Sequence, residues 1–172
     1  MISPLMLSNQ YPDISEVKVD LKSASIIYFA YSGLHGELGA SIYNANRFFC
    51  IYQTDDEQTK NLFLSIMLAE ICHFEILGNL LEKLGVDSRH LKLIPHVIDN
   101  GGITRLEGKK NLKKALLDGL SFELVSIETY KKLLKRLKNQ KVKSVIERII
   151  LDEEYHAEAL RQKIREKNIQ IS

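Results

Sequence analysis

Residues 69–85 read AEICHFEILGNLLEKLG, with Glu70 three positions before His73. The same Glu-x-x-His spacing returns later in DEEYHAEAL, as Glu153 and His156. Residues three apart on an α-helix lie on the same face, so each pair places a carboxylate beside an imidazole. If both segments are helical, each helix presents two metal-binding groups side by side.

Apolar residues around both motifs recur every three or four positions, which is the period of a helix that faces a core. The chain of 172 residues contains only nine Gly and three Pro, so long helices are possible. A segment at 86–110 lacks this period and holds Pro95 and Gly101-Gly102; we interpret it as a long crossover between the two ends of a bundle. The pattern predicts four helices, at about residues 21–52, 57–84, 112–137 and 142–167.

Each of the four apolar stripes is interrupted by residues that can carry charge. Glu37 interrupts the first helix and Glu123 the third, while the two Glu-x-x-His pairs interrupt the second and fourth. Burying one unpaired carboxylate costs several kcal/mol, and four together repel one another. Two divalent cations would balance four glutamates, whereas the alternative is a buried polar network without metal. The sequence therefore predicts a two-metal site, with the ligands Glu37, Glu70, His73, Glu123, Glu153 and His156.

One glutamate from each of two helices and a Glu-x-x-His pair from each of the other two form the ligand set of di-iron and di-manganese carboxylate bundles. The segment YSGLHGELGASIYN (31–44) and the two segments quoted above resemble the ferritin-like superfamily, particularly rubrerythrins and manganese catalases. The resemblance covers about residues 28–165. It implies an all-α, up-down four-helix bundle with the long crossover between the second and third helices, in one domain covering residues 1–172.

The resemblance also implies how the ligands are shared between two metals. Glu37, Glu70 and His73 would bind one metal and Glu123, Glu153 and His156 the other, with Glu70 and Glu153 bridging. Asp152 would accept a hydrogen bond from the outer ring nitrogen of His73. The matching position in the first half is Ala69, so any such partner of His156 must come from elsewhere. Oxygen and imidazole ligands without a thiolate suit iron or manganese, and the sequence does not choose between them.

Several neighbouring residues are interpreted as structural. Glu128 and Glu154 fall off the apolar stripe and are expected on the surface, with a spare-ligand role as the alternative. Tyr130 is expected in the core rather than as a redox residue, and Cys72 is expected to pack. One departure from rubrerythrins is Leu120, at a position where they usually carry a further glutamate. Another is that this sequence contains no cysteine-rich rubredoxin module.

The resemblance and the ligand set predict an oxidoreductase that acts on hydrogen peroxide, or on O2, as a catalase or as a rubrerythrin-like peroxidase with an external electron donor. The alternatives are a ferroxidase or iron-storage protein, and a ferritin-like structural or coat component. A homo-oligomer is expected, with a dimer as the default. The net charge of +2 does not favour a nucleic-acid partner, and no secretory signal or membrane span is predicted, so the expected location is the cytoplasm.

Overall fold

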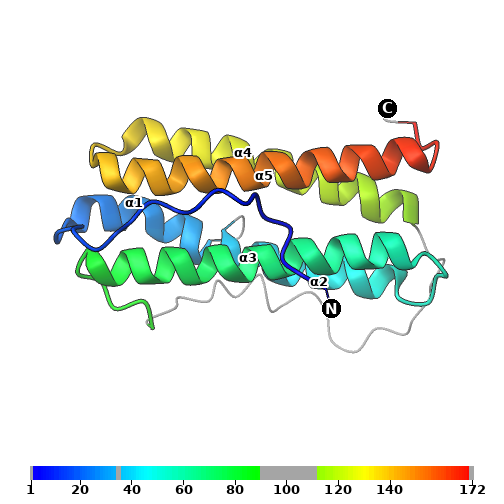
Figure 1. Ribbon diagram of the computed structural model, residues 1–172, viewed down its shortest axis with the longest axis horizontal. Helices are drawn as coiled ribbons and strands as arrows, with labels where there is room; N and C mark the ends of the chain where they lie inside the picture. Colours follow the sequence, from blue (N-terminus) through cyan, green and yellow to red (C-terminus); the bar gives the residue numbers. More distant parts are fainter. Residues whose placement is uncertain (1, 34–35, 90–111, 171–172) are drawn as a thin grey trace.

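The computed structural model describes residues 2–33, 36–89 and 112–170. Within these residues all regular structure is helical, as the sequence predicted. The helices pack lengthwise in a bundle, with α1 and α2 together forming the first of its four rods (Figure 1). The predicted crossover at 86–110 lies almost entirely outside the described residues. The helices are α1 (Leu21–Ser32), α2 (Glu37–Ile51), α3 (Glu57–Lys83), α4 (Leu112–Arg136) and α5 (Gln140–Glu166).

Side chains at the start of three helices satisfy backbone N–H groups that have no partner within the helix. Asp20 accepts a hydrogen bond from the Ser23 amide at the start of α1, and Asp56 accepts one from the Thr59 amide at the start of α3. Asn139 caps α5 in the same way. These caps fix where the helices begin, and hence the height at which their polar residues lie in the bundle.

The first predicted helix, at residues 21–52, is interrupted in the structure, which corrects the sequence prediction. α1 ends at Ser32 and α2 begins at Glu37, with Gly33 and Gly36 in extended backbone at the two ends of the break. A Cβ atom on Gly36 would lie 2.4 Å from the carbonyl oxygen of Ala30, so only glycine fits there. The break makes Glu37 the first residue of a new helix.

The hydrophobic core falls into two clusters. One gathers around Leu77, Leu80 and Ile146, and the other gathers around Phe63 and Leu116. Along both α3 and α5, the Glu-x-x-His pair lies between residues of one cluster and residues of the other. The bundle therefore contains a polar layer enclosed by apolar layers, in which any unpaired charge would be poorly solvated.

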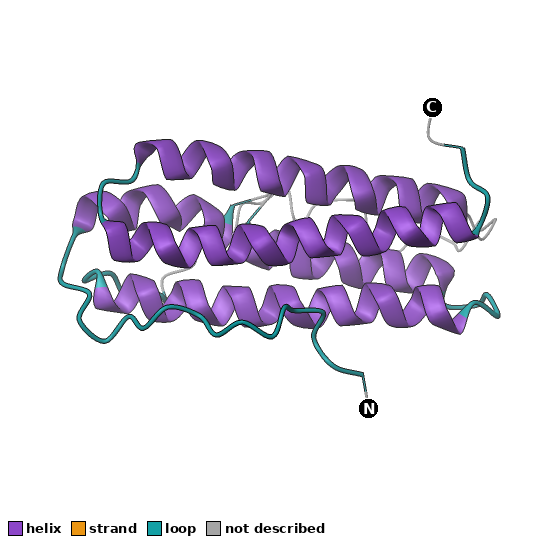
Figure 2. Ribbon diagram, turned by 45° about the horizontal axis from the view of Figure 1, so that its top comes forward, coloured by secondary structure: helices purple, strands orange, loops and turns teal. Residues whose placement is uncertain are grey.

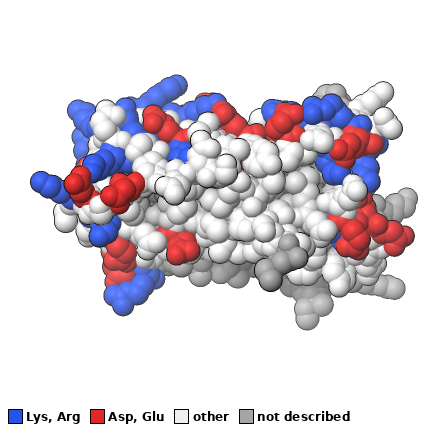
Figure 3. Space-filling model, in the orientation of Figure 1, with Lys and Arg blue, Asp and Glu red and all other residues white. Residues whose placement is uncertain are grey.

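An extended segment precedes α1 and was not anticipated from the sequence. It runs along the outside of the bundle over α3 and α5 (Figures 1 and 2). The Leu5 amide donates to the Ser65 carbonyl of α3 at 3.0 Å, and Val17 is buried. We call residues 2–12 the N-terminal strap; their sequence, ISPLMLSNQYP, contains no charged residue. In the face shown in Figure 3, charged side chains gather at both ends of the bundle and are sparse across the middle.

Helix α3 is long and apolar enough to cross a membrane, by length and composition alone. Its inward residues Glu70 and His73 are buried, and it packs against α1, α2 and α5. Burial of one apolar face against other helices is the arrangement of a core helix, so this property is weak support for a membrane role.

Candidate metal centre

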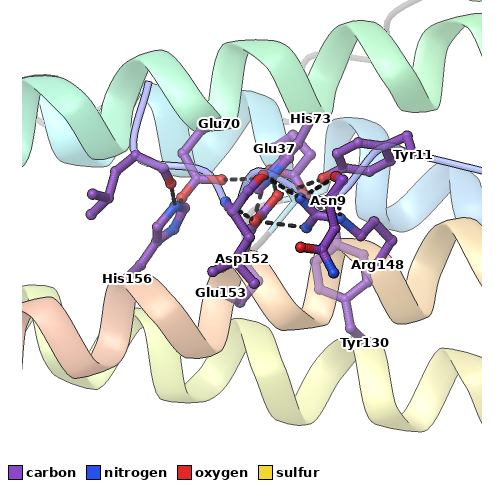
Figure 4. Close-up of polar contacts among 12 residues, drawn as sticks. Asn9, Tyr11, Glu37, Glu70, His73, Tyr130, Arg148, Asp152, Glu153 and His156 are labelled. Atoms are coloured by element: carbon purple, nitrogen blue, oxygen red, sulfur yellow. Dashed lines mark hydrogen bonds and ion pairs between the residues drawn. The ribbon is translucent and has the colours of Figure 1, made fainter. Parts of the chain in front are cut away.

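The structure brings all six predicted ligand residues into the interior of the bundle. Each of the four glutamates is 1% exposed, and both histidines are 0% exposed. They come from α2, α3, α4 and α5, and most of them are seen between the helices in Figure 4. The apolar periodicity thus placed them on the correct faces of the correct helices.

The six residues form two overlapping groups in which the ligand atoms all lie within 4.8 Å of one another. Glu70 and Glu153 belong to both groups, which is the arrangement expected of two shared carboxylates. The first group also contains Glu37 and His73, and the second also contains Glu123 and His156.

Several buried atoms of this cluster have no hydrogen-bond partner. They include both carboxylate oxygens of Glu123, one oxygen each of Glu37, Glu70 and Glu153, and Nδ1 of His156. An unsatisfied buried polar atom costs about 1–3 kcal/mol, and more when it is charged. Because the unsatisfied atoms are carboxylate oxygens and an imidazole nitrogen pointing at a common centre, the donor set fits two hard or borderline cations such as iron or manganese.

The electrostatics of the metal-free cluster show how strongly it attracts positive charge. Burial raises the pKa of Glu123 to about 8. Burial and the negative charge of Glu70 raise the pKa of Glu37 well above its ordinary value. Burial alone would lower the pKa of His73, but the nearby carboxylates, Glu37 first, raise it well above its usual range. The carboxylates around His156 raise its pKa in the same way, so without metal the cluster holds protons instead.

The predicted partner of His73 is in place. The Nε2 atom of His73 lies 3.2 Å from Oδ2 of Asp152, while its Nδ1 atom faces Glu153 at 3.2 Å and Glu70 at 3.3 Å. Burial would raise the pKa of Asp152, but hydrogen bonds from His73 and from its other partners hold it well below its usual range. Asp152 is therefore an anion that accepts the outer proton of His73 and leaves Nδ1 directed at the cluster.

The partner of His156 could not be assigned from the sequence. Its Nε2 atom lies 2.7 Å from the backbone carbonyl oxygen of Leu5, in the N-terminal strap. Every residue has a backbone carbonyl, so no residue type at position 5 could have indicated this contact. The strap is thus part of the surroundings of the site, although no motif identified it.

Tyr130 is 2% exposed and lies in the core, as expected, but it also has a polar role. Its hydroxyl donates a hydrogen bond to Oε1 of Glu37 (Figure 4). The sequence interpretation treated Tyr130 only as packing because it lies two turns beyond Glu123 on the same helix. Its partner belongs to another helix, and such a contact depends on how α2 and α4 are aligned.

The residues considered as spare ligands lie elsewhere. Glu128 and Glu154 are exposed, and they pair with Lys132 at 3.6 Å and Lys131 at 2.8 Å. They therefore take no part in the buried cluster. The sequence pattern also predicts His35 on the surface and places His90 and His96 in the crossover; all three lie outside the described residues.

The fold and the buried cluster together define the class of protein: a ferritin-like helical bundle of the dimetal-carboxylate type. The chain belongs to the rubrerythrin family, whose model matches residues 42–164. The matched range includes five of the six candidate ligands and leaves out Glu37, which precedes it.

Solved structures agree with this fold. The crystal structure of wild-type KatB, a manganese catalase from Anabaena, has a TM-score of 0.68 and 16% sequence identity; the match covers 94% of this chain and 80% of that one. A second KatB structure from Anabaena has a TM-score of 0.71 at 16% identity, covering 97% of this chain and 83% of that one. At this identity the likeness concerns the fold alone. No curated protein matches the chain.

Proposed function

We propose that this protein is a two-metal carboxylate oxidoreductase that acts on hydrogen peroxide. The residues proposed to hold iron or manganese are Glu37, Glu70, His73, Glu123, Glu153 and His156. The observation that carries the proposal is the set of buried carboxylate oxygens without hydrogen-bond partners, arranged in two groups that share Glu70 and Glu153. Four of these oxygens face Nδ1 of His73 or His156 at 3.2–3.5 Å, and two ring nitrogens cannot satisfy all of them. A buried polar network without metal normally pairs each of its polar atoms.

The bound pair of metals would supply two-electron redox chemistry at one place. In a catalase reaction, one hydrogen peroxide takes up two electrons and two protons to give two waters. A second hydrogen peroxide gives up two electrons and two protons as it becomes O2. The electrons and protons balance, so this reaction needs no outside donor. Both similar structures are of a manganese catalase, and the fold that this chain shares with them supports the catalase version.

The protein's own contribution is to hold the ligands and to limit water. His73 and His156 each direct Nδ1 inward and are held on the outer side through Nε2. The ligand residues are at most 1% exposed, so a small neutral molecule is better suited to reach them than a large or charged one. A surface cavity of about 300 Å³ has Leu5 in its wall, and the carbonyl of the same residue contacts His156.

The test is an oxygen-electrode assay of protein reconstituted with manganese or with iron. We expect oxygen from hydrogen peroxide without added donor, and loss of this activity in Glu153→Gln. Glu154→Gln is the matched control, because Glu154 is the exposed neighbour of the same length and charge. If oxygen is absent but peroxide is consumed when an electron donor is added, the peroxidase version holds. Loaded protein that does neither contradicts the proposal.

The same metal-loaded protein can be used to distinguish iron storage from peroxide chemistry. It predicts assembly into a large shell and uptake of many iron ions per chain, accompanied by consumption of O2. Size-exclusion chromatography and iron titration would show these properties directly.

A further inference from the structure

The N-terminal strap contacts the outer side of the cluster at two places. One contact is made to His156 directly, and the other is made to His73 through Asp152. The strap is uncharged throughout, and it lies over α3 and α5, the two helices that carry the Glu-x-x-His pairs. Its contacts to the site are made mainly by backbone atoms.

The contact to His156 determines which of its ring nitrogens carries a proton. A backbone carbonyl oxygen can only accept a hydrogen bond, so the Nε2 atom 2.7 Å from the Leu5 oxygen must carry hydrogen. In a neutral imidazole the proton is then absent from Nδ1. This nitrogen faces Glu70 at 3.4 Å and Glu123 at 3.5 Å, which is where a metal would accept its lone pair.

The contact to His73 passes through one buried carboxylate. Asp152 accepts hydrogen bonds from the Leu7 amide and from the Tyr11 hydroxyl, both at 2.8 Å. Its Oδ2 atom also lies 3.2 Å from Nε2 of His73. Two strap residues therefore fix the position of the carboxylate that orients His73.

Arg148 connects the strap to this carboxylate. Its side chain is 6% exposed and forms an ion pair with Asp152 at 2.7 Å. It also donates to the carbonyl oxygens of Leu7 at 2.8 Å and of Asn9 at 3.0 and 3.1 Å, and its guanidinium lies 4.6 Å from the centre of the Tyr11 ring. The planar guanidinium can serve all these partners at once, which a lysine ammonium cannot do in the same geometry.

We propose that the N-terminal strap is a positioning element of the metal centre, which fixes the orientation and tautomer of both histidine ligands and is clamped by Arg148 (Figure 4). The inference rests on the proposed metal site but not on peroxide as the substrate. Outer partners of ligand histidines are worth about 10- to 100-fold in metal affinity, so loosening the strap should weaken metal retention by a similar factor.

The first experiment measures the rate at which loaded protein releases manganese to a chelator. We expect release to be about 10- to 100-fold faster in Arg148→Gln, with only partial rescue in Arg148→Lys. Arg161→Gln is the matched control, since Arg161 lies on the same helix and, among the described residues, forms its ion pair with Glu158, at 3.6 Å. Release at the wild-type rate from a folded Arg148→Gln protein would overturn the proposal.

The second experiment removes one backbone donor from the strap. Leu7→Pro deletes the N–H group that bonds Asp152, whereas Leu7→Ala shortens the same side chain and keeps that N–H. We expect faster manganese release in Leu7→Pro than in Leu7→Ala. Equal rates in the two variants would count against a positioning role and would indicate packing instead.

The third measurement needs no variant, so it stands even if a substitution prevents folding. In wild-type protein, we expect the Leu7 amide to exchange with solvent more slowly after zinc or manganese is bound, because metal binding immobilises His73 and Asp152. In the zinc-loaded, diamagnetic protein, ¹⁵N NMR should show the proton of His156 on Nε2. A proton on Nδ1, or Leu7 exchange that does not change on metal binding, would overturn the proposal. Metal-loaded protein that passes these tests but leaves peroxide intact would contradict only the proposed function.

Discussion

The two halves of the candidate metal centre contain the same types of ligand but are supported differently. On the His73 side, side chains hold the ligands: Asp152 contacts the imidazole, and Tyr130 donates to Glu37. On the His156 side, the described support is the backbone carbonyl of Leu5, and neither oxygen of Glu123 has a hydrogen-bond partner. The first half is therefore largely formed by protein contacts alone, whereas the second depends more on the metal itself.

The largest expected effect is a difference in metal content between variants of a shared ligand and variants of an unshared one. Glu153→Gln removes a carboxylate that belongs to both groups, so we expect almost complete loss of bound metal. Glu123→Gln removes a ligand of one group only, and it should leave about one metal ion per chain on the His73 side. Elemental analysis after desalting measures both. Full metal content in Glu153→Gln would contradict a shared carboxylate.

A smaller effect is expected from the side-chain support of the first half. Asp152→Asn removes the negative charge that faces His73 and Arg148, and it should weaken metal binding by about 10- to 100-fold. Competition with a chelator of known affinity measures this change. The loss should come mainly from the metal on the His73 side. Glu154→Gln, two positions along the same helix and exposed, should bind metal as the wild type does.

The pH dependence of stability should reverse when metal is bound. In the metal-free chain, Glu123, His73 and His156 all have raised pKa values, so the folded state binds protons more tightly than the unfolded state. The histidine part of that stabilisation is complete below the unfolded pKa of about 6.5, and the Glu123 part is complete below about 4.5; both parts are lost as pH rises through the folded values. Bound metal needs those protons removed, so it should stabilise the loaded protein more at higher pH. Melting temperatures between pH 6 and 9, with and without manganese, measure the two slopes, and parallel slopes would contradict this explanation.

The smallest effect is expected from Tyr130. Tyr130→Phe leaves one oxygen of Glu37 without its donor, and it should destabilise the metal-free protein by about 1–3 kcal/mol with little change in metal content. Urea unfolding measures the free energy. Tyr155→Phe, at an exposed position on α5, should change it by less than about 0.5 kcal/mol. An equal effect of the two changes would mean that the contact with Glu37 is not stabilising.

The sequence was sufficient to predict the bundle and the place of all six candidate ligands, because a charged residue in phase with an apolar stripe must point inward. It did not predict the break between α1 and α2, since the apolar period continues through Gly33 and Gly36. Only the backbone shows that a helix here ends and begins again at Glu37. Periodicity indicates which face of a helix a residue occupies, but it does not establish that the helix is continuous.

The strap was missed for a different reason. Leu5, Leu7 and Asn9 contact the site or Arg148 through carbonyl oxygens, which every residue type offers, and through an amide, which every type except proline offers. Arg148 and Tyr11 do have informative side chains, but they are far apart in the sequence and follow no spacing rule. Their role depends on how an extended segment lies against the finished bundle, which is a tertiary property.

The central claim is that the six buried residues hold two metal ions between α2, α3, α4 and α5. Anomalous X-ray diffraction from crystals grown with manganese or iron tests it most directly. We expect two anomalous peaks inside the bundle, one next to Nδ1 of His73 and the other next to Nδ1 of His156, with Glu70 and Glu153 reaching both. A well-ordered crystal grown in excess metal that shows no peak among these residues would contradict the claim.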